Sequence, residues 1–429
     1  MMADMLSITE GLTFDESLQE YQVHEYEPQA GAQLNNAGAE IRINIETQDL
    51  FLHPSESYLL IEGQLRKNDG AAYADADLVS LVHNGVMFLF RSISYRLSGQ
   101  QIEHLNDPGI ATTMLGMLTY PDDFSKSRGL NQLWFKDSTA DAEAENVGFA
   151  ARHGYIITKP ANKGSFSFSI PLKHVFGFAE DYDKIVYGFK HELSLVRDSD
   201  ANAILRAAAV NDVAKIVLSK VSWFVPHVIP SDEKKLRLYK TIQSKTKIDC
   251  GFRMRQCDSI AVPQTSQFHW RLAAKSGREK PRWIIVAFQT ERDNDQLHNA
   301  AVFDHCRLRN IHVTLNAERY PAVDFNAGFT QCRVARVYKE AAEFRKKFHS
   351  MESLLSNGGI NPSDFIDLYP LFVIDVSHQS ERLKESTVDI QIRAEFERNV
   401  PANTQAFALV ISDRILQFES DGQKMSVVF

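Results

Sequence analysis

The clearest pattern along the chain is an alternation of apolar and polar residues, which is typical of half-buried β-strands. Residues 165–172 (SFSFSIPL) place Phe, Phe, Ile and Leu on one face and small polar groups on the other. Residues 388–396 (VDIQIRAEF) repeat this alternation with charged residues on the outer face. Similar patterns predict further strands at residues 40–46, 57–66, 184–197, 214–225, 265–273, 282–290, 308–315, 370–376, 405–411 and 413–419.

One strand pattern occurs twice, with the same residues before it. In the first half, residues 83–88 (HNGVMF) precede 91–99 (RSISYRLSG), and in the second half 298–303 (HNAAVF) precede 309–317 (RNIHVTLNA). Both copies have His-Asn, a Phe five residues after the His, and an alternating strand that begins Arg-x-Ile. Repeat arrays have periods of 20–50 residues, so a separation of roughly 215 residues indicates two similar domains in tandem.

Two segments have the spacing of helices, and each follows its copy of the Arg-x-Ile strand. Residues 331–348 carry a stripe of apolar side chains (Val334, Val337, Ala341, Phe344 and Phe348), and Glu343 and Lys347 form an i, i+4 pair. A shorter helix is expected at residues 110–119. The order of elements is therefore duplicated together with the strand.

These patterns predict a mainly β protein made of two tandem eight-stranded antiparallel jelly rolls, with short helices confined to connections. We expect an N-terminal arm without structure of its own at residues 1–39, a first jelly roll at 40–235 and a second at 236–429. The charged segment 230–245 marks the junction. Residues 137–146 are acidic and small, which predicts an exposed loop.

The composition is that of a globular protein, with 44% hydrophobic and 24% charged residues and 27 Phe. No apolar run is long enough for a transmembrane helix, and the N-terminus does not resemble a signal peptide. The four cysteines (Cys250, Cys257, Cys306 and Cys332) include no C-x-x-C pair and favour buried free thiols in a reducing compartment. We therefore expect synthesis in the cytosol.

The net charge of −8 argues against a protein that grips nucleic acid through a basic face. The first 41 residues contain eight acidic residues and no Lys or Arg, so the arm is poorly suited to bind DNA phosphates.

No motif in the sequence identifies a catalytic, cofactor or metal site. Both the phosphate-binding loop G-x-x-x-x-G-K-[ST] and a G-x-G-x-x-G after a strand are missing. His191-Glu192 begins like a zinc-protease helix, but position 195 is Leu and the segment alternates as a strand. His298, His305 and Cys306 are possible metal ligands, although structural zinc needs four ligands, usually in close pairs. We predict no enzyme, cofactor or metal here.

Three further features have an ordinary structural interpretation beside a functional one. Asp122-Asp123 follows Tyr120-Pro121, as expected of a turn. Trp134-Phe135 and Trp223-Phe224 could bind a ligand, but packing in a core or a subunit interface is the simpler interpretation. The basic residues of the 331–348 helix could contact an acidic partner or form a solvated face (Arg333, Arg336, Lys339, Arg345, Lys346 and Lys347).

Several motifs resemble the double jelly-roll major capsid proteins of Polinton/Maverick elements and adintovirus-like DNA viruses, in the tectivirus–adenovirus lineage. In the second half these are residues 281–290 (PRWIIVAFQT), 303–306 (FDHC), 310–311 (NI), 319–321 (RYP), 375–383 (DVSHQSERL), 388–392 (VDIQI) and 420–429 (SDGQKMSVVF). A weaker resemblance over residues 57–125 is carried by Asn84, Leu89-Phe90 and residues 97–99 (LSG).

This resemblance implies a structural protein of a virion. Three chains would form a pseudo-hexameric capsomer, and many capsomers would tile an icosahedral shell around double-stranded DNA. The implied partners are further copies of the chain and penton or minor capsid proteins, without sequence-specific nucleic-acid binding. The protein would be made in the host cytoplasm, with the host nucleus as a candidate place of assembly. Whether a membrane lies beneath the shell is left open.

Three other interpretations stay open at this stage. The chain is shorter than many capsid proteins of that lineage, which predicts short outer loops and leaves room for an accessory, or minor, capsid role. A jelly roll with exposed aromatic residues such as Trp134 could instead bind a carbohydrate or a receptor. Two fused β domains also occur in bicupin enzymes, but these need clustered His and Glu ligands, and the chain has no H-x-H.

Overall fold

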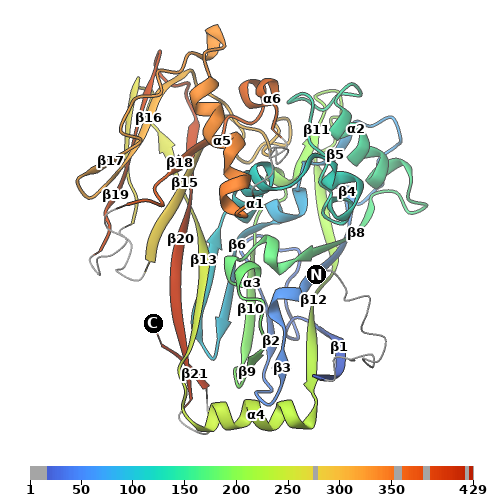
Figure 1. Cartoon of the computed structure of the whole chain (residues 1–429). Coiled ribbons are helices and arrows are strands. Elements are labelled where there is room, and N and C mark those ends of the chain that lie inside the picture. The colour runs from blue at the N-terminus through green and yellow to red at the C-terminus, as the bar shows by residue number, and fades with distance from the viewer. Residues whose placement is uncertain (1–16, 274–278, 352–359, 380–386, 421–424, 429) are drawn as a thin grey trace, which may run out of the picture.

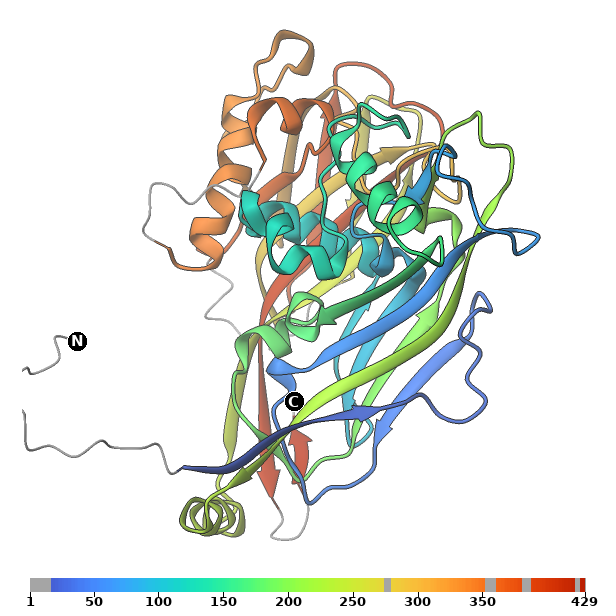
Figure 2. The ribbon, with the colours of Figure 1, turned by 90° about the vertical axis from the view of Figure 1, so that its right-hand side faces the viewer.

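The computed structural model describes residues 17–273, 279–351, 360–379, 387–420 and 425–428. It contains two antiparallel β-sandwiches that stand side by side, with helix α4 across one end of the pair (Figure 1). Both sandwiches have their long strands along the long axis of the molecule (Figures 1 and 2).

The first sandwich is built from two main sheets. One has the order β8-β4-β12-β3-β9, with β1 paired to β12, and the other has the order β2-β10-β6-β7. Strands β5 and β11 form a separate pair. The strands are β1 (Leu18–Tyr26), β2 (Glu40–Ile45), β3 (Phe51–Leu52), β4 (Tyr58–Lys67), β5 (Val79–Leu81), β6 (Phe90–Leu97), β7 (Gln100–Asn106), β8 (Ser165–Pro171), β9 (Val186–Tyr187), β10 (His191–Arg197), β11 (Ile204–Arg206) and β12 (Ala214–Pro230).

The second sandwich repeats this plan. One sheet has the order β13-β20-β15-β18, with β21 paired to β20, and the other has the order β14-β19-β16-β17. The strands are β13 (Ile248–Val262), β14 (Gln267–Arg271), β15 (Glu279–Thr290), β16 (Leu308–Leu315), β17 (Glu318–Tyr320), β18 (Phe372–Asp375), β19 (Ile390–Phe396), β20 (Thr404–Ser420) and β21 (Met425–Val428).

The two sandwiches match strand by strand. The order β2-β10-β6-β7 corresponds to β14-β19-β16-β17, and β8-β4-β12 corresponds to β18-β15-β20. The two Arg-x-Ile strands, β6 and β16, occupy the same place in their sheets. The prediction of two tandem antiparallel jelly rolls is confirmed, whereas the boundaries drawn at residues 40, 235 and 236 stay a prediction.

The strand match also gives β1 a role that the sequence did not reveal. Strand β1 pairs with β12 just as β13 pairs with β20, so β1 completes the sheet of the first roll. We expected residues 1–39 to form an arm without structure of its own, and this is wrong for Leu18–Tyr26. Almost every residue of β1 is exposed, so its sequence lacks the apolar alternation that marks a half-buried strand.

Helices lie in the connections. Both predicted helices are confirmed, and each follows its copy of the Arg-x-Ile strand. The α-helices are α1 (Pro108–Thr119), α2 (Val147–His153), α3 (Gly177–Asp181), α4 (Asp232–Gln243), α5 (Ala335–Phe348) and α6 (Pro362–Asp367). Short 3-10 turns lie at Pro54–Glu56, Gly85–Leu89, Asp122–Lys126, Arg128–Gln132, Leu172–His174, Ala201–Ala203 and Phe329–Gln331, and a π-helical turn at Gly154–Thr158. No helix within the described ranges is long and apolar enough to cross a membrane.

Three strand assignments differ from the sequence-based expectation. Strands β7 and β13 were not predicted, and residues 405–411 and 413–419, expected as two strands, form the single strand β20. Asp413 and Arg414 suggested a break in this strand. Both are paired instead, since Asp413 Oδ1 lies 3.4 Å from Arg282 Nη1 and Arg414 Nε lies 3.8 Å from Glu279. The strand therefore continues through them.

The cysteines follow the prediction only in part. Cys250 and Cys257 are buried free thiols, Cys306 is partly buried, and Cys332 is exposed. Burial raises the pKa of Cys250 to about 12, which makes its thiol unreactive at neutral pH.

The alternation in β8 gives a direct test of which face lies in the core. Phe168 is fully buried, whereas its neighbour Ser167 is exposed. We expect Phe168→Ala to lower the free energy of unfolding by about 3–5 kcal/mol. Ser167→Ala, the matched control, should change it by less than about 1 kcal/mol. Urea denaturation of both variants would measure the difference, and equal losses would contradict the assigned register.

Candidate functional site: the seam between the two jelly rolls

The possible metal and zinc-protease residues lie apart from one another. His191 is buried on β10 with its Nδ1 2.8 Å from the Tyr95 hydroxyl, and Glu192 pairs with Arg96 at 3.0 Å. His298 pairs with Asp295 (2.7 Å), the His305 ring stacks on Phe329, and the Cys306 Sγ lies 4.0 Å from the Thr290 hydroxyl. In the described part of the chain, no group of three or more His, Cys, Asp or Glu side chains is placed to hold a metal.

The acidic pair and the basic helix are engaged in local contacts. Asp122 begins a 3-10 turn with Asp123 and accepts a hydrogen bond from Lys136 Nζ at 3.0 Å. On α5, Lys347 lies 3.1 Å from Asp375 and 3.3 Å from Glu340. Lys339 pairs more loosely with Glu343, at 3.7 Å, and Arg336 donates to the Asp324 carbonyl. Arg333 and Lys346 are exposed and Arg345 is half-buried.

The two tryptophans belong to the core. Trp134 is 3% exposed and Trp223 is fully buried. The expectation that Trp134 is exposed for ligand binding is therefore wrong. Its ring packs against the backbone of α1 at Gly116, where an added Cβ would lie 2.2 Å from the indole.

A fully buried ion pair forms the first contact between the two jelly rolls. Asp137 Oδ1 lies 2.6 Å from Arg152 Nη2, and both side chains are completely inaccessible to solvent. Arg152 also donates to the carbonyls of Leu81, at 2.9 Å, and Phe135. The guanidinium thus fastens the segment between α1 and α2 to the first roll.

The same carboxylate reaches the second roll. Asp137 Oδ2 accepts a hydrogen bond from Asn299 Nδ2 at 2.9 Å, and the Asp137 N–H donates to the Tyr369 hydroxyl at 3.1 Å. Burial, and next the charge of Asp137, raise the pKa of Tyr369 well above its usual value. Residues 137–146 were expected to form an exposed loop, but Asp137 and Asn146 at its two ends are buried. Their polar side chains are satisfied inside the protein, which a charge-based interpretation of the sequence could not show.

Both copies of the His-Asn motif end beside this segment. Asn299 binds Asp137, and its first-half counterpart Asn84 donates to the hydroxyls of Thr112 (2.8 Å) and Thr113 (3.1 Å) on α1. His83 is fully buried against the Trp134 ring. Burial and the nearby Arg152 lower the pKa of His83 well below its usual value. The repeated motif therefore has a packing role at the seam.

A second polar cluster joins the rolls through the edge of β13. Glu103 on β7 is fully buried and accepts hydrogen bonds from three backbone N–H groups: Gly177 (3.1 Å), Phe178 (2.9 Å) and Arg255 (2.7 Å). The first two lie on α3 of the first roll and the third lies on β13 of the second. Burial raises the pKa of Glu103 to about 7, against the opposing effects of Arg255 and these N–H groups.

The next outward-facing N–H group of β13 is capped in the same way. The Arg253 N–H and Nε donate to Asp181 Oδ2 at 2.7 and 2.9 Å, and Arg255 pairs with Glu180. Burial would raise the pKa of Asp181, but the hydrogen bonds and charge of Arg253 bring it below its ordinary value. At Gly177 a Cβ would lie 1.7 Å from the Arg253 carbonyl oxygen, so this close approach requires glycine.

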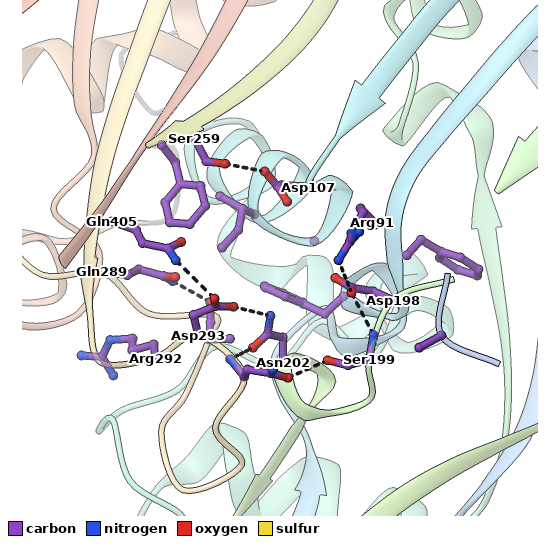
Figure 3. A pocket seen from close by; sticks show the side chains of 18 of the residues that line it. Arg91, Asp107, Asp198, Ser199, Asn202, Ser259, Gln289, Arg292, Asp293 and Gln405 are labelled. Carbon is purple, nitrogen blue, oxygen red and sulfur yellow. Dashed lines mark hydrogen bonds and ion pairs between the residues drawn. The ribbon is translucent and has the colours of Figure 1, made fainter. Parts of the chain in front are cut away.

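Between these clusters the seam contains a polar pocket of about 560 Å³ (Figure 3). Its walls come from both rolls and are bridged by side chains. Asp107 accepts from Ser259 at 3.2 Å, and Asp293 accepts from Asn202 at 3.1 Å. Burial raises the pKa of Asp107, and the carboxylates of Asp198 and Asp293 add to the effect. Across the whole seam, carboxylates are held by N–H groups, hydroxyls or guanidinium groups, which is an arrangement that fixes two domains relative to each other.

A histidine cluster lies at the end of the first roll where β1 joins β12. The rings of His24 and His227 stack with centroids 3.9 Å apart, and His227 Nε2 lies 2.7 Å from the Tyr26 hydroxyl. Burial and the charge of His24 lower the pKa of His227 to about 4. Burial and the charge of His227 lower the pKa of His191 to about 3.

Comparison with known proteins bears on the whole fold. A family profile described as double jelly roll-like domain matches residues 79–416, which is most of the chain.

The chain belongs to the double jelly roll-like domain family.

Solved structures of this double jelly-roll fold resemble the chain over its full length. A chain of the Sputnik virophage matches with a TM-score of 0.62 and 10% sequence identity, covering 100% of this chain and 92% of that chain. The mavirus major capsid protein matches with a TM-score of 0.59 and 11% identity, covering 99% and 92%. A chain of the PBCV-1 virus capsid matches with a TM-score of 0.56 and 9% identity, covering 98% and 99%. A search of curated proteins found no match.

The residues that join the double jelly roll at its seam were not identified from the sequence. Asp137, Arg152 and Glu103 lie far apart along the chain and belong to no known motif. Arg253 and Arg255 alternate in the sequence FRMRQ, as expected of charged residues on one side of a strand. Only the fold shows that the first roll covers them.

The buried ion pair should be the polar interaction at the seam that is most sensitive to mutation. We expect Asp137→Asn to lower the free energy of unfolding by about 3–5 kcal/mol, because Arg152 would keep a buried charge without a counter-charge. Asp141→Asn is the matched control, since Asp141 lies in the same segment but is exposed, and should change stability by less than about 0.5 kcal/mol. Chemical denaturation would measure both variants. A loss below 1 kcal/mol in Asp137→Asn would contradict the role given to the pair.

The histidine cluster predicts a loss of stability in acid. The pKa of His227 is about 4 in the folded chain, against about 6.5 for an unfolded histidine. Between these values the unfolded chain binds more protons, so stability is fully present above about pH 6.5 and falls as the pH drops toward 4. Thermal unfolding from pH 7.5 to 4.5 should show this fall. His227→Gln should give a shallower fall, and an unchanged profile in that variant would contradict the prediction.

Proposed function

We propose that the chain is a major capsid protein of a double-stranded DNA virus, related to the Polinton/Maverick and adintovirus-like group. Homotrimers would form pseudo-hexameric capsomers that tile an icosahedral shell. The observation that carries this proposal is the pair of matching jelly rolls held in a fixed relation by buried polar contacts. The full-length likeness to chains of viral capsids supports it.

A tandem pair of similar domains suits a hexagonal building block. Three such chains supply six near-equivalent corners, so a pseudo-hexamer needs only three subunits. The resulting role is structural, in the virion, with other copies of the chain and penton or minor capsid proteins as partners. We propose no enzymatic activity, cofactor or sequence-specific nucleic-acid binding.

The carbohydrate-binding alternative loses its main support in this fold. It rested on exposed aromatic residues such as Trp134, which is buried beneath α1. An accessory role in the capsid shares the same fold and the same partners, and it differs in whether the isolated protein forms capsomers by itself.

The proposal predicts the mass of the purified protein in solution. Three copies of the 48.6 kDa chain give a trimer of about 146 kDa. Light scattering should find this mass, and negative-stain images of the same sample should show particles with a hexagonal outline or closed shells. A monomer that stays monomeric at all concentrations would contradict the role of major capsid protein.

A further inference from the structure

Strand β1 leaves one of its two edges open. It pairs with β12 along one edge, and no described strand pairs with the other. Its side chains are exposed along almost the whole strand, including Leu18 (49%), Tyr21 (45%) and Val23 (49%). A long exposed edge strand with apolar side chains is a template for pairing with another chain, and proteins generally protect such edges.

The equivalent strand of the second roll shows how such an edge is covered. Strand β13 occupies the place of β1, and its outer edge faces the first roll. There the N–H groups of Arg253 and Arg255 donate to the carboxylates of Asp181 and Glu103, both at 2.7 Å. The first roll of the chain therefore caps the edge strand of the second.

We propose that the open edge of β1 receives the second jelly roll of another copy of this chain. The contact made within the chain by the first roll on β13 would then recur between chains, made by the second roll on β1. This inference rests on the proposed function and specifies where its subunits meet.

The geometry of one chain fits this head-to-tail contact. Figure 1 shows β1 on the side of the first roll that faces away from the second roll. Strand β17 lies on the opposite side of the molecule, on the outer side of the second roll (Figure 1). β17 is the counterpart of β7, which carries Glu103 within the chain. A contact between two different surfaces forms a ring when its rotation closes, and three double units would close a ring of six rolls.

Substitution of an exposed residue on β1 tests the contact without disturbing the core. Val23→Asp places a charge on the open strand, and Val147→Asp is the matched control on α2, where Val147 is 71% exposed. We expect Val23→Asp to raise the dissociation constant of the trimer by about tenfold or more, because the new carboxylate would be buried without a partner. Val147→Asp should assemble like the unmodified protein.

Light scattering over a dilution series measures assembly, and thermal unfolding of the monomer checks that each variant is folded. Assembly of Val23→Asp equal to that of the unmodified protein would overturn the inference and leave the proposed function intact. An unmodified protein that never assembles would instead overturn the proposed function. Loss of assembly in both variants would show that the effect is not specific to β1, which also counts against the inference.

Cross-linking identifies the partner directly. In a Cys332→Ser background, which removes the exposed thiol, Val23→Cys and Glu318→Cys would place one thiol on β1 and one on β17. With a short bismaleimide linker we expect covalent trimers when one chain carries both changes. Covalent dimers from Val23→Cys alone would indicate that two β1 strands pair with each other and would overturn the proposed partner. The absence of cross-linked product in an assembled trimer would overturn it as well.

Discussion

The arrangement of the two jelly rolls depends on how the outer edge of β13 is satisfied. A strand edge carries N–H groups that cost free energy when they are buried without acceptors. Here two carboxylates of the first roll, from Glu103 and Asp181, accept from successive outward-facing N–H groups of β13. The acceptors are fixed in turn by the backbone of α3 and by two arginines, so the position of one roll determines that of the other. Glycine at position 177 permits the approach, since any Cβ there would collide with β13.

The segment between α1 and α2 provides a second fixed point at some distance along the same seam. Its Asp137–Arg152 pair is buried completely, which by itself is weak evidence of net stabilisation, because desolvation offsets much of the attraction. The value of the pair lies in its connections. One carboxylate joins Arg152 of the first roll to Asn299 of the second, and its backbone N–H meets Tyr369. Two such fixed points along one interface oppose rotation as well as translation of the rolls.

The sequence predicted much of the fold and almost none of the seam. Strands with one apolar face, such as β8 and β19, and the amphipathic helix α5 were found because burial on one side leaves a periodic pattern. Strand β1 was missed because it is exposed on both faces, and β13 because its charged residues face another domain. Glu103 could not be found from local pattern, because nothing near position 103 indicates that residues 177, 178 and 255 fold back onto it.

The fusion of two rolls into one chain explains why the inner contact can be polar and closely fitted. Within a chain the two rolls are held at high effective concentration, so their contact needs little association energy and its residues can serve geometry. A contact between separate chains must also overcome the loss of translational and rotational freedom, which favours burial of apolar surface. The two equivalent edges differ in this sense. Capped by carboxylates, β13 is fixed within the chain, whereas the open β1 presents Leu18, Tyr21 and Val23. That difference is expected if one edge joins domains and the other joins subunits.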